Sequence, residues 1–139
     1  QGGVVASLYA AAYPDRVHKL LLIFPAFVLF DDAKETYREL GSPDFDQLPD
    51  SLTHHNTTLG KIYLIDALDI DIQAEQAKIT APTLIIHGTD DAVVPYQYAV
   101  QASQTIPNAK LVTVEGGEHR IDERFAITAA PAIQKFLKE

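Results

Sequence analysis

The chain has 139 residues, 47% of them hydrophobic and 22% charged, a composition typical of one soluble globular unit with a single core. Its formal charge is −8 and its Lys and Arg residues are scattered, which argues against a nucleic acid partner. No apolar run reaches the roughly 18 residues that span a bilayer, and the lack of cysteine excludes disulfides and thiolate metal sites. We expect a soluble, cytoplasmic protein with no metal and no cofactor.

The first part of the chain predicts an apolar helix and an apolar strand, followed by a segment that is acidic and rich in turn residues. Residues 2–13 (GGVVASLYAAAY) are small and apolar, the pattern of a buried helix that packs very close to a sheet. Residues 17–24 (VHKLLLIF) form a nearly continuous apolar run before Pro25, which predicts a strand covered on both faces. Residues 26–80 are acidic and rich in turn signals, with one helical pattern around 62–68, and they predict an insertion.

The second part alternates strands with helices. Strands are predicted at 83–87 and 110–114, a helix at 96–105 between them, and a terminal helix at 121–137 that Pro131 should interrupt. This order predicts an α/β fold with a parallel sheet, formed by residues 1–25 and 81–139. Three strands make a thin sheet, so we expect this core to be part of a larger one.

An acid and a histidine follow two of these strands. Asp91 lies in the loop after the strand that ends at His87, and His119 lies in the loop after the strand that ends at Val114. Reacting groups collect at the carboxyl ends of parallel strands, and one strand–helix–strand crossover returns the chain to that edge. A carboxylate that accepts from an imidazole N–H prepares the ring to deprotonate a hydroxyl, so the pair predicts nucleophilic catalysis.

Other residues of the same types have plainer explanations. Asp90 could cap the following helix as easily as Asp91, although the spacing to Val94-Pro95 favours Asp91 as the functional acid. His87, at a strand end before glycine, is expected to be a structural hydrogen-bonding group. The adjacent pair His54-His55 is expected at the surface, because neighbouring side chains do not face one metal ion.

Three segments resemble motifs of the α/β-hydrolase superfamily, in the superfamily's order. They are 1–3 (QGG), like the second half of the Gly-x-Ser-x-Gly nucleophile elbow, 87–95 (HGTDDAVVP), like the acid loop, and 116–119 (GGEH), like the histidine loop. The resemblance implies the C-terminal part of an α/β-hydrolase fold, a mostly parallel sheet flanked by helices, with residues 26–80 as an inserted cap. It places the nucleophilic serine immediately before Gln1, gives Asp91 and His119 the acid and base roles, and makes the Gln1 N–H an oxyanion donor.

Within the superfamily the chain is most similar to bacterial cinnamoyl (feruloyl) esterases. The likeness rests on 1–7 (QGGVVAS), 13–15 (YPD), Leu59-Gly60 with Tyr63, and 87–94 (HGTDDAVV). In that subfamily an aspartate and a tyrosine of the cap hold the phenolic hydroxyl of the substrate, and the matching positions are Asp32 and Tyr63. The resemblance implies a serine esterase that acts on hydroxycinnamate or similar aryl esters through an acyl-enzyme.

Alternatives to this function stay open at the level of sequence. Tyr63 could simply pack inside the cap, and Asp32 could be a solvated acid. The same triad serves lipases, thioesterases and peptidases, and the chain without its serine could be a non-catalytic fragment that acts as a binding partner. The partners we expect are a small-molecule ester and the missing N-terminal half of the fold, with a homodimer as a further option.

Overall fold

A computed structural model describes residues 1–54 and 56–139, and these fall into two compact units. The first, called the α/β unit, combines Gln1–Phe27 with Ile72–Glu139, and the second, called the insertion unit, is Val28–Asp71. The expectation for the pair His54-His55 includes residue 55 and therefore lies outside the described residues.

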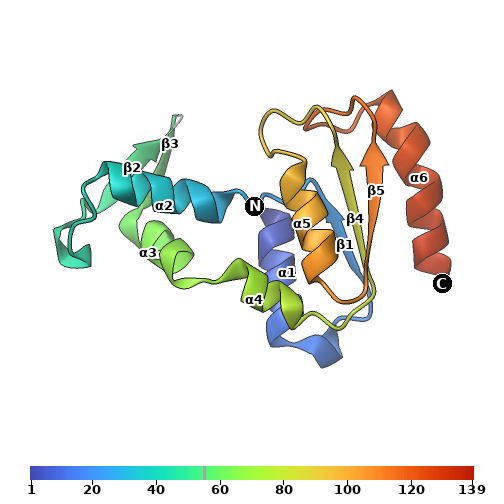
Figure 1. Cartoon of the computed structure of the whole chain (residues 1–139), viewed down its shortest axis with the longest axis horizontal. Helices are drawn as coiled ribbons and strands as arrows, with labels where there is room; N and C mark the ends of the chain where they lie inside the picture. The colour runs from blue at the N-terminus through green and yellow to red at the C-terminus, as the bar shows by residue number, and fades with distance from the viewer. Residues whose placement is uncertain (55) are drawn as a thin grey trace. The chain divides into compact units, whose positions relative to one another are not determined.

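The α/β unit is built on a three-stranded parallel sheet. Its elements are α1 (Gly2–Ala12), a 3₁₀ turn (Pro14–Arg16), β1 (Leu20–Ile23), α4 (Ile72–Ala77), β4 (Thr83–Gly88), α5 (Gln97–Thr105), β5 (Ala109–Val114) and α6 (Glu123–Lys138). The strand order is β1-β4-β5 (Figure 1), and Thr83 of β4 pairs with Leu20 on one side and Ala109 on the other. Every residue of β4 is buried, as expected for a central strand with neighbours on both sides and helices on both faces.

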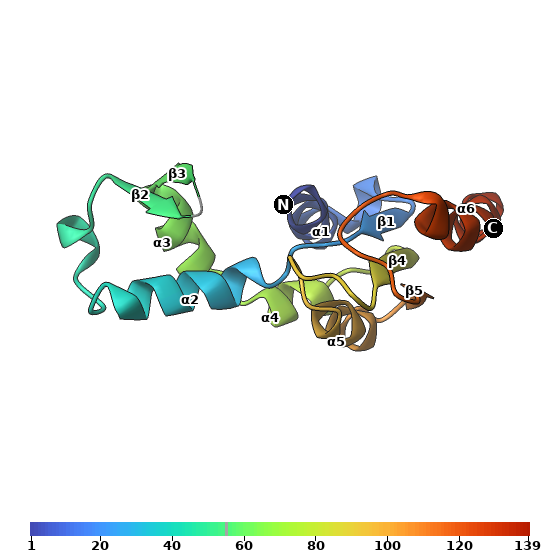
Figure 2. The ribbon, with the colours of Figure 1, turned by 90° about the horizontal axis from the view of Figure 1, so that it is seen from above.

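Helices cover both faces of this sheet. Helices α1 and α5 lie on one face and α6 on the other (Figure 2). Gly3 allows α1 to come close to the sheet, since a Cβ at this position would sit 3.1 Å from Cβ of Pro25. On the other face, α6 presents an apolar stripe to the strands, and the buried cluster there is Leu84, Ile86, Val114, Phe125, Ala129 and Phe136. The α/β architecture with a parallel sheet predicted from the sequence is confirmed.

Two expectations about helices were wrong. Helix α1 is buried on one face only, because Val5 and Tyr9 on its outer side are 65% and 45% exposed. Helix α6 runs through Pro131 without interruption. Pro131 lies on the exposed side of α6, where the Ile127 carbonyl that loses its usual N–H partner can bond to water instead.

The insertion unit consists of two helices and a hairpin. Its elements are α2 (Leu29–Glu39), a 3₁₀ turn (Phe45–Gln47), β2 (Ser51–His54), β3 (Thr57–Gly60) and α3 (Lys61–Asp69). Strands β2 and β3 pair antiparallel, and α2 packs against α3, where Phe30, Ala33, Leu64 and Ala67 are buried. The segment from Ile72 onward packs with the α/β unit instead, because α4 contacts α1 and α5.

Candidate active site

The site begins with Asp91, which the loop after β4 holds in a fixed position. The side chain of Asp91 is fully buried. Its Oδ1 accepts hydrogen bonds from the backbone N–H groups of Val93 at 2.9 Å and Val94 at 2.8 Å. These two backbone donors replace hydrogen bonds to water that the carboxylate loses on burial. The other oxygen, Oδ2, is left to bind other partners.

His119 is the main partner of that second oxygen. Its Nδ1 lies 2.7 Å from Oδ2 of Asp91, and its side chain is 34% exposed. A carboxylate next to Nδ1 favours the tautomer with the proton on Nδ1, which then donates to Asp91. The lone pair of Nε2 is thereby available to take a proton from a hydroxyl. The structure thus brings together the acid and the histidine that the sequence placed at two different strand ends.

Backbone hydrogen bonds tie the two loops to each other. The N–H of Thr89 donates to the Val114 carbonyl at 3.1 Å, and the N–H of Asp90 donates to the Gly117 carbonyl at 2.9 Å. In the opposite direction, the N–H of Gly116 donates to Oγ1 of Thr89 at 2.8 Å. Hydrogen bonds between the two chain segments therefore continue past the ends of β4 and β5, and they hold Asp91 beside His119.

This close approach requires glycine at one point. A Cβ added to Gly88 would lie 2.1 Å from the carbonyl oxygen of Gly117, a distance that no side chain tolerates. By contrast, a Cβ on Gly2 would meet nothing within 4 Å. Close packing of α1 against the end of β1 therefore depends on Gly3 and not on Gly2.

Two further aromatic rings, those of His87 and Phe24, lie around the acid–histidine pair. His87 is fully buried, and its Nε2 lies 2.9 Å from the Val94 carbonyl oxygen and 3.1 Å from Oδ2 of Asp91. Both neighbours are acceptors, so Nε2 carries the proton. The ring of Phe24 lies 5.1 Å from that of His119 and 5.9 Å from that of His87. The prediction that His87 is a structural hydrogen-bonding group is confirmed. Phe24 was not singled out in the sequence, and only its position after a strand could have suggested its role.

Asp32 and Tyr63 lie in the insertion unit, and the charge of Asp32 acts on Tyr63. Asp32 is an exposed residue of α2, and Tyr63 is a half-buried residue of α3. Burial raises the pKa of Tyr63, and the negative charge of Asp32 raises it further. The structure therefore places these two predicted binding residues near each other on packed helices.

Gln1 directly precedes α1, which starts at the end of the sheet where the strands finish (Figure 1). Its carbonyl oxygen accepts from the N–H groups of Val4 at 2.9 Å and Val5 at 3.2 Å. Gln1 thus sits at the positive end of a helix dipole, an environment that favours negative charge.

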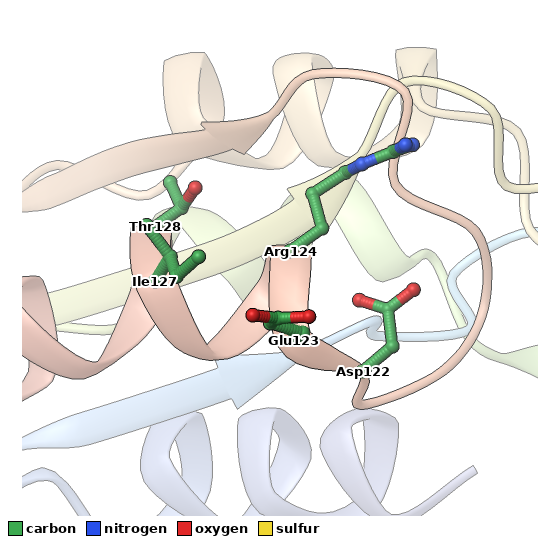
Figure 3. Close-up of a pocket in the computed structure, with 5 residues that line it drawn as sticks. All are labelled: Asp122, Glu123, Arg124, Ile127 and Thr128. Atoms are coloured by element: carbon green, nitrogen blue, oxygen red, sulfur yellow. The ribbon is translucent and has the colours of Figure 1, made fainter.

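A separate hollow of about 480 Å³ lies at the start of α6 (Figure 3). Its lining residues are Asp122, Glu123, Arg124, Ile127 and Thr128. None of the predicted site residues lines it, and Arg124 instead donates to the carbonyl of Gly116 in the histidine loop.

Within residues 1–54 and 56–139, no group of three or more His, Asp or Glu side chains is placed to hold a metal ion. Nor is any helix in this part of the chain long and apolar enough to cross a membrane.

Several known proteins are similar to this chain. Est1E from Butyrivibrio proteoclasticus superposes with a TM-score of 0.81 at 30% identity, covering 99% of this chain and 58% of that one. A further structure of Est1E contains bound ferulic acid. RutD from Stutzerimonas stutzeri strain A1501, whose name carries a provisional assignment as a carbamate hydrolase, is 39% identical over 70 residues. The non-heme chloroperoxidase CPO-A1 from Kitasatospora aureofaciens is 40% identical over 67 residues.

These matches extend over only part of the relatives. The aligned segments cover 50% of this chain and 26% of RutD, and 47% of this chain and 24% of CPO-A1. A model of the TAP-like protein family matches residues 68–139, about half of the chain, including both Asp91 and His119. With the parallel sheet, the flanking helices and the strand-end loops in place, the chain belongs to the TAP-like family and has the α/β-hydrolase fold.

Proposed function

We propose that the whole protein is a carboxylic ester hydrolase that works through a serine acyl-enzyme. The observation that carries the proposal is the 2.7 Å contact between Nδ1 of His119 and Oδ2 of Asp91. A buried carboxylate that is already satisfied by two backbone donors can hold an imidazole in one orientation and stabilise its protonated form. The arrangement is suited to general-base activation of a hydroxyl.

In the proposed reaction, the nucleophile is the serine that the family resemblance places immediately before Gln1. Nε2 of His119 takes the serine proton as the hydroxyl attacks the ester carbonyl, and then passes that proton to the leaving alcohol. The N–H of Gln1, at the start of α1, helps to bind the oxyanion of the tetrahedral intermediate. Water then releases the acid by the same route, again with His119 as the base.

The proposed substrates are hydroxycinnamate or similar aryl esters, and the insertion unit is proposed as the cap over the acyl group. Two observations support this choice. The first is the structural likeness to Est1E, which has been solved with ferulic acid. The second is the raised pKa of Tyr63, caused by burial and then by the charge of Asp32, which keeps a protonated phenol near a carboxylate. Such a pair offers one donor and one acceptor, as a phenolic hydroxyl of the substrate requires.

Two experiments on the whole protein test the proposal. A fluorophosphonate probe should add one adduct to the intact mass, whereas a mass without an adduct would favour the non-catalytic alternative. His119→Ala should lower ester turnover by about 10³-fold or more. His18→Ala, at an exposed histidine outside the site, is the matched control and should leave turnover unchanged. Full activity in His119→Ala would end the proposal.

The substrate class needs its own comparison. Asp32→Ala should impair the hydrolysis of hydroxycinnamate esters and hardly affect short aliphatic esters, because only the former carry a phenolic hydroxyl. Asp31→Ala, an exposed neighbour on the same helix, controls for the loss of one negative charge from α2. Equal losses on both ester classes in Asp32→Ala would refute a phenol-binding role.

A further inference from the structure

Phe24 has a backbone conformation that its residue type rarely adopts. It follows β1 directly and has φ of +47°, in the left-handed region. Among residues 1–54 and 56–139, the other non-glycine residues with positive φ are Ser42 and Asn56, whose small polar side chains occur more readily in turns. Phe24 is bulky and also precedes Pro25, a position that favours extended backbone. The conformation costs folding free energy, so its surroundings must enforce it.

The surroundings of Phe24 do enforce it. Its N–H donates to the Ile86 carbonyl at 3.0 Å, so the ladder between β1 and β4 holds the chain up to this residue. The next residue, Pro25, is buried and lies so near α1 that a Cβ on Gly3 would be 3.1 Å from its Cβ. The chain therefore turns sharply between a fixed strand and a fixed proline.

The turn aims the ring of Phe24 at the acid–histidine pair. The ring centre lies 5.1 Å from that of His119, 5.2 Å from that of Phe125 and 5.9 Å from that of His87, which it meets edge-on. One side chain thus touches both imidazoles whose nitrogens lie within 3.1 Å of Oδ2 of Asp91. An imidazole held through one nitrogen can still rotate about that hydrogen bond, and a ring packed against it limits this rotation.

We propose that Phe24 is a positioning residue for His119: its left-handed turn holds the aromatic ring against the imidazole and keeps Nδ1 aligned on Asp91. This inference rests on the proposed role of His119 as the base. Simple core packing would not require this backbone, since a large apolar side chain fills space equally well from an ordinary conformation. Strain retained next to a reacting group is typical of functional sites.

The test uses variants of the whole protein that separate the backbone from the ring. Phe24→Gly and Phe24→Asn both tolerate the left-handed conformation and lack the ring, so that one can replace the other if it folds poorly. Phe24→Tyr keeps the ring. Phe136→Leu is the matched control, because it removes a phenyl ring from the buried cluster against which Phe24 packs, on a helix turn remote from His119 in sequence. Each variant is measured for thermal midpoint, kcat and KM on a short activated ester, and exchange of the His119 Nδ1 proton by NMR.

We expect kcat to fall about 10-fold or more in Phe24→Gly and Phe24→Asn, with KM within about twofold, because misalignment affects the chemical step more than binding. The His119 Nδ1 proton should exchange with water at least about 10-fold faster in both. Phe24→Tyr should keep both properties, and Phe136→Leu should lose thermal stability but keep kcat. A kcat within twofold of wild type in either ring-free variant would overturn the inference, and so would an equal kcat loss in Phe136→Leu.

The proton-exchange measurement keeps this inference distinguishable from the proposed function. If the wild-type protein hydrolyses no ester, the proposed function fails, and exchange of the His119 proton still decides the positioning role. Unchanged exchange in both ring-free variants would overturn it, and faster exchange would support it.

Discussion

Replacing Gly88 by alanine tests how the acid loop and the histidine loop are held together. The added Cβ would lie 2.1 Å from the Gly117 carbonyl oxygen, where ordinary contact begins at 3.4 Å, so the loops would have to separate by about 1.3 Å. If the separation is passed on to the catalytic pair, the distance from Oδ2 of Asp91 to Nδ1 of His119 grows from 2.7 Å to about 4 Å. A hydrogen bond does not survive at that distance.

The expected losses follow from this shift. A hydrogen bond to a charged group contributes about 1.5–3 kcal/mol, which corresponds to a fall of about 10- to 100-fold in kcat if the bond matters chiefly in the transition state. Overpacking should also lower the free energy of unfolding by about 1–3 kcal/mol. The assay combines ester turnover with urea unfolding of the whole protein.

Gly60→Ala is the matched control for Gly88→Ala. Gly60 has φ of −67°, and a Cβ there would meet only ordinary contacts at 3.8 and 3.9 Å. This variant should keep wild-type stability and wild-type turnover of a short aliphatic ester. If Gly88→Ala behaved in the same way as Gly60→Ala, the proposed tight apposition of the two loops would be refuted.

Three further predictions concern the packing and electrostatics of the two units. Lys19→Met should lower the free energy of unfolding by about 1 kcal/mol, measured in urea, because Nζ donates to the last carbonyls of α6 at 2.6 and 3.2 Å; no change would contradict this. A hydrogen bond from the Phe125 N–H and the nearby Arg120 hold the pKa of Asp122 below its usual value. Stability that is present above about pH 4 should therefore fade with acid, and thermal midpoints should fall less in Asp122→Asn than in wild type. Asp32→Asn should lower the pKa of Tyr63 in a spectrophotometric titration compared against Tyr63→Phe, and an unmoved pKa would disprove the influence of Asp32. In wild type that raised pKa should also cost stability as the pH rises above about 10.

The order of strands, loops and helices in the α/β unit was predictable because each element leaves a local pattern. Apolar runs marked β1 and β4, and residues 110–114 (KLVTV) marked β5. The loops that follow β4 and β5 marked Asp91 and His119 as candidate partners. Local patterns predicted less well where neighbours decide the outcome. Whether α1 was covered on one face or two, and whether Pro131 broke α6, depended on what surrounded each helix.

The sequence alone determined that an acid and a histidine follow neighbouring parallel strands, since strand direction and crossover length are local properties. Only the tertiary structure decided their 2.7 Å contact, which depends on the register of β4 with β5 and on the hydrogen bonds between their loops. The same holds for the burial of His87 against Asp91 and for the left-handed turn at Phe24. Such features arise from the simultaneous packing of segments far apart in the chain, and no local pattern of residues encodes them.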